Sequence, residues 1–287
     1  MHTVWLASYP RSGNTLVRIL LANYFLARFE PLSLHALQHF NFGEHIQGLW
    51  QQVIGKSLPE VDEPTQWLSR PAYFKALRAT TPPVPRRFIK THTLNCTRWG
   101  VPAFHFRPSD RIIYVARSPA DVVISLAAFH GWDIGHAKSH LLNPVASLHH
   151  PDLGHEVTGS WNLHVNSWAQ NTDCPVLVVP FSQLRADPAT WLVRMLTFID
   201  AKPNLQHVQN CVKWTRFDSL QEQEARHGFP EAPRGENRQP FFRAGLVGQW
   251  QDILIPQQVE KIVNACATGM KLIGDPVAQT GQAGPGA

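Results

Sequence analysis

A short turn between an apolar run and an amphipathic segment constrains this chain more than any other stretch. Residues 3–7 are mostly apolar, residues 8–15 read Ser-Tyr-Pro-Arg-Ser-Gly-Asn-Thr, and residues 16–26 have an amphipathic pattern. This order predicts a strand, a tight turn and a helix, which direct free backbone N–H groups and the positive end of the helix dipole at one point. We predict a phosphate-sized anion site formed by Arg11, Ser12, Gly13, Asn14 and Thr15.

The turn differs from a Walker A loop, in which a lysine follows the second glycine. Asn14 stands where that lysine would be, and Ser8 replaces the first glycine. The cation of the turn is instead Arg11, two residues before Gly13. Such a site suits a phosphate or sulfate ester better than a triphosphate. Taken alone, the turn is also compatible with an ordinary strand-to-helix connection.

Short apolar runs alternate with helical patterns along the whole chain. We predict strands over Val4–Ser8, Arg87–Lys90, Arg111–Ala116 and Val176–Val179. We predict helices over Asn14–Ala27, Thr65–Arg78, Pro119–Phe129, Gly159–Asn171, Pro188–Ile199 and Pro256–Thr268. Because βα alternation favours a parallel sheet covered on both faces, we expect an α/β fold, a P-loop-like three-layer αβα arrangement with a central parallel sheet.

The length of the chain, 287 residues, is enough for one large domain. We predict a single domain over residues 1–273 and a disordered tail over residues 274–287, which are rich in Gly, Pro, Gln and Ala. Two long connections between the predicted elements, residues 28–86 and 131–158, which we call excursions, begin near the carboxyl edge of the sheet. Ligands bind at this edge in open α/β folds. They are candidate walls of a substrate pocket. The histidines of the second excursion lack zinc-site spacing, so we expect no metal.

Charge and cysteine content exclude several classes of protein. The formal net charge of +5 fits a polyanionic ligand, but the chain has no Lys/Arg run typical of nucleic-acid binding. The four cysteines are far apart and no apolar run is long enough to span a membrane. With no signal-like segment either, we expect a cytoplasmic protein without a membrane span. The oligomeric state is not predictable from these features.

A second group of candidate residues ends the second predicted strand. Lys90 and His92 are two residues apart, so they lie on the same side of an extended chain. A cation there can stabilise negative charge, while an imidazole, whose ordinary pKa is close to neutral pH, can accept a proton. In a chain with 15 histidines, a structural role for His92 remains an equal alternative.

A third group follows the third predicted strand. We interpret Ser118 as a helix N-cap, Pro119 as the first helical residue and Asp121 as the carboxylate of a capping box. Arg117 then lies at the mouth of the strand–helix turn, and Ser125 follows in the helix. Arg117 could bind a second phosphate through its fork of donors or pair with Asp121, and the pattern does not decide between them.

Together these segments resemble the sulfotransferase family that uses 3′-phosphoadenosine 5′-phosphosulfate (PAPS), and its cytosolic branch in particular. The family's Tyr-Pro-Lys-Ser-Gly-Thr-Thr loop matches residues 9–15, and its Lys-Thr-His strand end matches residues 90–92. Its arginine and serine eight positions apart match Arg117 and Ser125. Its Gly-Ser-Trp helix resembles residues 159–168, and its late Phe-Arg-Lys-Gly…Gly-Asp-Trp loop resembles residues 241–250. The resemblance covers nearly the whole chain in the same order.

The resemblance implies transfer of a sulfuryl group from PAPS to the hydroxyl of a small-molecule acceptor, with PAP as the product and no metal. It implies that His92 takes the acceptor proton, while Lys90 and Arg11 neutralise charge on the transferring group and the leaving phosphate. It further implies that PAPS contacts Arg11, Ser12, Gly13, Asn14, Thr15, Leu16, Arg117, Ser125, Phe181, Phe217, Arg243, Ala244 and Gly245.

Several positions differ from the family pattern. Arg11 replaces the loop lysine, which keeps the charge needed at a phosphate leaving group. Phe181, Leu16, Arg216 and Ala244 replace a tyrosine, a tryptophan, a serine and a lysine at the nucleotide end. These differences leave two alternatives, a P-loop-type nucleotide-dependent kinase and a relative that binds nucleotide without catalysis. The missing Walker lysine argues against the first, and the Lys90/His92 pair against the second.

Overall fold

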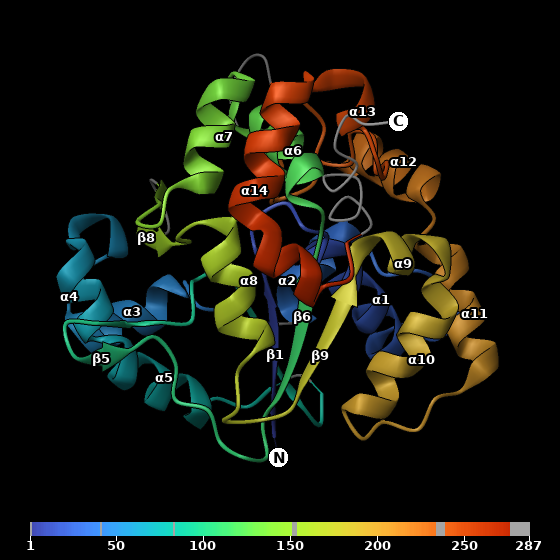
Figure 1. Ribbon diagram of the computed structural model, residues 1–287. Coiled ribbons are helices and arrows are strands. Elements are labelled where there is room, and N and C mark those ends of the chain that lie inside the picture. Colours follow the sequence, from blue (N-terminus) through green and yellow to red (C-terminus); the bar gives the residue numbers. More distant parts are fainter. Residues whose placement is uncertain (1, 41, 83, 151–153, 234–238, 276–287) are drawn as a thin grey trace.

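The centre of the molecule is a parallel sheet in the strand order β2-β3-β1-β6-β9 (Figure 1). The computed structural model describes residues 2–40, 42–82, 84–150, 154–233 and 239–275. The sheet strands are β1 (Thr3–Ser8), β2 (Phe42–Gly43), β3 (Arg87–Thr91), β6 (Arg111–Ala116) and β9 (Val176–Pro180). Two small antiparallel pairs lie outside it, β4 (Thr97–Arg98) with β5 (Val101–Pro102) and β7 (Ser147–His150) with β8 (Gly154–Val157).

Helices surround this sheet (Figure 1). They are α1 (Asn14–Leu26), α2 (Leu37–Phe40), α3 (Gln47–Ile54), α4 (Glu63–Leu68), α5 (Arg70–Ala79), α6 (Pro119–His130), α7 (Ile134–Leu142), α8 (Trp161–Ala169), α9 (Phe181–Ala186), α10 (Pro188–Phe198), α11 (Leu205–Trp214), α12 (Phe217–His227), α13 (Trp250–Ile253) and α14 (Pro256–Leu272). Single 3₁₀ turns cover Leu34–Ala36 and Leu58–Glu60. Among the described residues, no helix combines the length and apolar character needed to cross a bilayer.

Each face of the sheet has its own hydrophobic core, because side chains alternate between the faces of a strand. Trp5 and Tyr114 belong to a core with α5, α8 and α14, whose members include Trp161 and Trp168. The neighbouring strand residues, such as Leu6, face a second core with α1, α10 and α11. The predicted three-layer αβα fold with a central parallel sheet is therefore confirmed.

Three local predictions differ from the structure. The predicted helix over Thr65–Arg78 is divided into α4 and α5 at Ser69, since Pro71 has no N–H to donate and its ring excludes a continuous helix. The capping-box interpretation of Asp121 is wrong, because its carboxylate accepts from the amides of Gly248 (2.9 Å) and Trp250 (3.3 Å) instead. The edge strand β2 is absent from the prediction, as two residues carry no pattern.

The end of the chain is described as far as Asp275, which is buried and whose amide donates to the carbonyl of Met270 at 2.9 Å. Gly274 and Asp275 thus continue the packing of α14, although the sequence predicts that the tail begins at Gly274. Residues 276–287, the rest of that predicted tail, lie outside the described residues.

A buried carboxylate attaches the edge of the sheet to its centre. Glu44 directly follows β2 and is 1% exposed, and its Oε2 accepts from the guanidinium of Arg70 at 2.6 Å. Its Oε1 accepts from the hydroxyls of Thr91 and, at 3.0 Å, Thr93. Since these threonines flank His92, Glu44 fixes the backbone on both sides of that histidine.

We expect Glu44→Ala to lower the free energy of unfolding by about 3–5 kcal/mol, because the variant leaves the Arg70 guanidinium buried without its charge partner. Urea denaturation measures this effect. The matched control is Glu222→Ala, which removes an exposed carboxylate paired with Arg226 and should change stability by less than about 0.5 kcal/mol. Equal losses in the two variants would contradict the structural role of Glu44.

Candidate active site

A large cavity lies beyond the carboxyl ends of the central strands, with a volume of about 1070 Å³. Residues of the β1–α1 turn, the end of β3, α6, the start of α9 and the chain after α12 line it. Of the residues that the sequence predicts for PAPS and catalysis, all except Ser12 line this one cavity. Both predicted excursions contribute to its wall, the first through residues 38 and 43–46 and the second through residues 132, 136, 140, 147–149 and 156.

The β1–α1 turn has the backbone shape of an anion site. Gly13 is the N-cap of α1 with φ of 104°, and a Cβ there would lie 2.4 Å from the Phe181 ring, so only glycine fits. The side-chain amide of Asn14 donates to the carbonyl of Leu6 at 2.8 Å, which ties the helix start to β1. The buried Ser12 Oγ and Asn14 Oδ1 have no hydrogen-bond partner among the described residues. The turn therefore presents polar atoms whose hydrogen bonds a ligand could complete.

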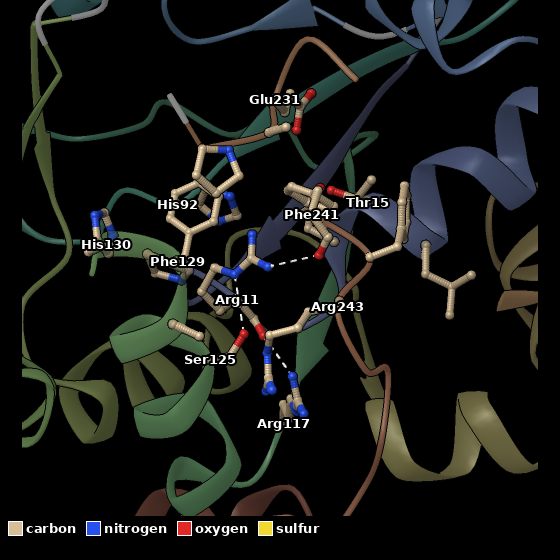
Figure 2. Close-up of a pocket in the computed structure, with 18 of the residues that line it drawn as sticks. Arg11, Thr15, His92, Arg117, Ser125, Phe129, His130, Glu231, Phe241 and Arg243 are labelled. Carbon is tan, nitrogen blue, oxygen red and sulfur yellow. Dashed lines mark hydrogen bonds between the residues drawn. The ribbon is translucent and has the colours of Figure 1, made fainter. Parts of the chain in front are cut away.

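The guanidinium of Arg11 is held between two aromatic rings (Figure 2). Its central carbon lies 4.2 Å from the ring centre of Phe129 and 4.5 Å from that of Phe241. Its Nε donates to Ser125 Oγ at 3.3 Å. Burial, followed by the nearby Arg117, lowers the pKa of Arg11 to about 10, so the side chain remains a cation at neutral pH. Its backbone has φ of 65°, a conformation that non-glycine residues adopt mainly where the surroundings enforce it.

A second basic region is formed by residues near the start of α6 and by residues 241–250, called the late loop below. Arg117 donates to the carbonyls of Arg11 (3.3 Å) and Leu246 (2.8 Å), while its buried Nε has no partner among the described residues. Its Nη2 is 3.9 Å from Asp121, so both roles that the sequence leaves open for Arg117 are compatible with the structure. Arg243 donates to Gln249 Oε1 at 2.8 Å and lines the same cavity.

Two phenylalanines form the apolar part of this region. Phe181 lies under the guanidinium of Arg117, 4.8 Å from ring centre to central carbon, and contacts Gly13 as described above. Phe217 contacts Gly245, where an added Cβ would be 2.4 Å from the ring. Arg185 lies 5.5 Å above the Phe217 ring and lines the cavity. Arg216, in contrast, is about two-thirds exposed, pairs with Asp218 and does not line this cavity.

The imidazole of His92 has a defined tautomer. Its Nδ1 lies 2.8 Å from the carbonyl oxygen of Ser8 and 3.1 Å from the Ser8 hydroxyl, which can either donate or accept. Because the carbonyl is the nearer partner and only accepts, we infer that Nδ1 carries the proton. The neutral ring then has no proton on Nε2, and His92 lines the cavity. Burial, followed by the charge of Lys90, lowers the pKa of His92 to about 4. At neutral pH His92 is therefore a neutral base.

A second histidine supports the first from behind. His164 of α8 is fully buried, and its Nε2 donates to the backbone carbonyl of His92 at 3.0 Å. Its Nδ1 then accepts from the hydroxyl of Tyr114 at 2.9 Å. Burial lowers the pKa of His164 to about 3, so it too is neutral. Together with Glu44, this chain of hydrogen bonds fixes the position of His92.

Another part of the cavity wall carries histidines, an aromatic ring and carboxylates. Trp132 stacks on His130 (4.3 Å between ring centres) and on His136 (4.5 Å). His45 Nε2 lies 3.6 Å from Glu156 Oε1, and both side chains line the cavity. With Glu44 they form a cluster whose ligand atoms lie within 4.8 Å of one another. Both oxygens of Glu44 already accept hydrogen bonds, so this cluster is explained as part of the network around β3.

Sequence reasoning missed several residues of the cavity. Arg18 of α1 and Glu231, from the chain after α12, form an ion pair inside it, and Arg185 adds a further cation. Of these residues, only Arg18 could have been recognised from the sequence, because it interrupts the apolar pattern of α1 and is buried between apolar neighbours. Glu231 and Arg185 lie in segments without such a pattern, so only the fold brings them to the site.

Comparison with known proteins identifies similar chains. A family model described as the sulfotransferase domain matches residues 2–274. Mouse sulfotransferase 1B1 is 25% identical over 183 residues, which are 61% of this chain and 58% of that relative. The chain spans about half the length of the curated relatives that it matches first.

Solved structures share the fold. Mouse sulfotransferase SULT7A1 complexed with PAP has a TM-score of 0.60 and 17% identity, over 97% of this chain and 86% of that chain. Retinol dehydratase in a complex with retinol and PAP has a TM-score of 0.60 and 18% identity, over 94% and 81%. At these identities the likeness concerns the architecture alone, and it agrees with the three-layer arrangement described above.

The two buried neutral histidines predict a pH dependence of stability. Their pKa values of about 4 and about 3 lie below the 6.5 of an unfolded histidine, so the unfolded state binds more protons. Their contribution is complete above pH 6.5 and decreases as the pH falls. We expect each histidine to lower the free energy of unfolding by up to about 1.4 kcal/mol per pH unit between pH 6.5 and 5.

Urea denaturation at several pH values in this range measures the slope. His164→Gln keeps a donor for the His92 carbonyl but does not titrate, so the slope should decrease by about half of the histidine contribution. His35→Gln, at an exposed histidine, is the control and should leave the slope unchanged. An unchanged slope in His164→Gln would argue that His164 does not titrate on unfolding as proposed.

Proposed function

The chain belongs to the sulfotransferase family, and we propose that it transfers a sulfuryl group from PAPS to the hydroxyl of a small-molecule acceptor. The observation that carries the proposal is one cavity with a neutral imidazole base, His92, and a cationic anion turn at Arg11. A base and a set of anion donors are the two components that such a transfer requires. Both are present in the described lining of this cavity.

The residues of the anion region fit a polyanionic nucleotide. Arg11, Arg117, Arg185 and Arg243 line the same part of the cavity, which makes it strongly positive. In the described part of the chain, the buried Arg117 Nε has no hydrogen-bond partner, and an unmade hydrogen bond of this kind is costly unless a ligand completes it. We propose that the turn residues 11–15 with Leu16 hold the 5′-phosphosulfate end of PAPS. Arg117, Ser125, Phe181, Phe217, Arg243, Ala244 and Gly245 would hold its 3′-phosphate and adenosine.

Each catalytic residue has a role that its surroundings favour. PAPS supplies an activated sulfuryl group on a phosphate leaving group, so no metal or acid is needed to expel it. His92 would accept the proton of the acceptor hydroxyl on Nε2, the nitrogen that its bond to Ser8 leaves unprotonated. Lys90 and Arg11 would neutralise the charge that develops on the transferring group and on the leaving phosphate.

The acceptor would enter along the wall formed by His45, Trp132, His136, Leu148 and Glu156. This wall offers flat rings and imidazoles rather than a continuous aliphatic surface. The likeness to retinol dehydratase, whose structure contains retinol and PAP, supports a small-molecule acceptor beside a nucleotide. We propose no nucleic-acid partner. A cytoplasmic location is also part of the proposal, and four cysteines without disulfides are compatible with it.

Nucleotide binding gives the first test. PAP should bind more tightly than AMP by a factor of at least about 10, because the 3′-phosphate adds a charge-assisted contact with Arg117 or Arg243. Isothermal titration calorimetry measures both affinities. Equal affinities would remove the case for a PAPS site, and ATP binding that depends on Mg²⁺ would favour a kinase instead.

His92→Ala gives the second test. We expect turnover of PAPS with an aliphatic alcohol acceptor to fall about 100-fold or more, while the affinity for PAP stays within about threefold. Mass spectrometry of the sulfated product and calorimetry with PAP measure the two quantities. Because the pKa of His92 is about 4, wild-type kcat/KM should be constant from pH 8 to about 5.5 and decrease below that.

The control for this test is the melting temperature of His92→Ala, since His92 is also packed and hydrogen-bonded. If the variant is well folded and its turnover is near normal, the assignment of His92 as the base is wrong. Turnover that rises through pH 6.5 would instead indicate a base with an ordinary pKa, at another position.

A further inference from the structure

A carboxylate stands beside the lysine that the proposed reaction requires. Glu231 Oε2 lies 3.6 Å from Lys90 Nζ, and both side chains line the cavity (Figure 2 shows Glu231). A negative charge here is unexpected in a site that must receive a polyanion. Burial raises the pKa of Glu231, but Lys90 and Arg18 outweigh it and hold the pKa below the usual range. Glu231 is therefore ionised at neutral pH.

The carboxylate is anchored by a different residue. Arg18 of α1 is 2% exposed, and its two terminal nitrogens donate to the two oxygens of Glu231 at 2.9 and 2.7 Å. Such a two-bond fork is the strongest geometry available to an arginine and a carboxylate. Glu231 is thus fixed to the same helix whose N-terminus forms the anion turn.

The contact between Glu231 and Lys90 is of a different kind. At 3.6 Å it is too long for a hydrogen bond, and each side chain is more than a quarter exposed. A partly exposed ion pair without a hydrogen bond has a small free energy. Lys90 can therefore leave Glu231 at little cost, whereas Glu231 stays on Arg18.

We propose that Glu231 is an exchangeable counterion that positions Lys90 in the donor-free enzyme and releases it to the sulfonate of PAPS. This inference rests on the proposed function, because it requires that the ligand of Lys90 be a sulfonate. It assigns Glu231 as a positioning residue and Arg18 as its anchor. Lys90 thereby always has a partner of opposite charge, first the carboxylate and then the transferring group.

The proposal makes Glu231 a competitor for one part of the donor only. PAPS carries the sulfonate that Lys90 would contact, whereas PAP lacks it. Glu231→Gln removes the competing charge but keeps a side chain of the same size. We therefore expect the ratio of the dissociation constants, Kd for PAP over Kd for PAPS, to rise about two- to fivefold in this variant. Affinity for PAP itself should change less than about twofold.

A double-mutant cycle isolates the role of Lys90. In a Lys90→Met background there is no cation to release, so adding Glu231→Gln should leave the ratio unchanged. Calorimetry without acceptor measures all four proteins with PAP and PAPS. Glu222→Gln, at an exposed carboxylate of α12 that pairs with Arg226, is the matched control and should have no effect.

Each outcome decides the matter. If the ratio of dissociation constants stays the same or falls in Glu231→Gln, the proposed exchange of Lys90 between Glu231 and the sulfonate is wrong. An equal rise of this ratio in the Lys90→Met background also overturns the proposal, because it would indicate that Glu231 repels the donor directly. If Glu231→Gln does not fold, Glu231→Asp gives the same test, since the shorter carboxylate can keep Arg18 while losing Lys90. A wild-type protein that binds neither nucleotide would refute the proposed function itself, whereas wild-type binding with an unresponsive ratio refutes only the counterion.

Discussion

The bond from His92 Nδ1 to the carbonyl of Ser8 is the contact on which the proposed chemistry of the site depends. It exists because β1 and β3 are parallel neighbours in the register Ala7 opposite Thr91, so that their carboxyl ends reach the same height. At this height the anion turn begins on one strand and the histidine follows the other. The bond sets the tautomer of His92 and ties its imidazole to the turn. A shift of one residue between the strands would place His92 on the other face of the sheet.

Charge divides the cavity into two regions. Arginines from α9, the β6–α6 turn and the late loop surround one end, where a polyanionic donor would bind. The carboxylates Glu156 and Glu44 stand at the other end. Burial and Lys90 lower the pKa of His92, and the two carboxylates raise it by a smaller amount. Glu231 and Lys90 meet between the regions. In the proposed reaction, an acceptor hydroxyl near His92 would lie on the less positive side, which favours an acceptor without strong negative charge.

The sequence predicted the fold because the main elements have local patterns. The apolar runs of β1, β3, β6 and β9 and the helix after the first turn depend on neighbouring residues, and the structure confirms them. The family could be predicted because its motifs are short and local, and the match to the family model confirms it. The roles of the site residues remain predictions, although the fold brings Arg11, Lys90, His92 and Arg117 to one cavity. In contrast, Arg18 and Glu231 are 213 positions apart in the sequence, and no local pattern predicts that they pair.

The substitution at Arg11 shows how a contact can change the meaning of a sequence difference. From the sequence, arginine only preserves the charge of the family's lysine. In the structure its planar guanidinium fills the space between Phe129 of α6 and Phe241 of the late loop, and Nη2 lies 3.5 Å from the Phe241 carbonyl. An ammonium group has neither the flat faces nor the fork of donors that these contacts use. Arg11 therefore links the anion turn to the loop that carries Arg243. In the proposed site, the residue that contacts the 5′-phosphosulfate thus also holds in place the loop that contacts the 3′-phosphate.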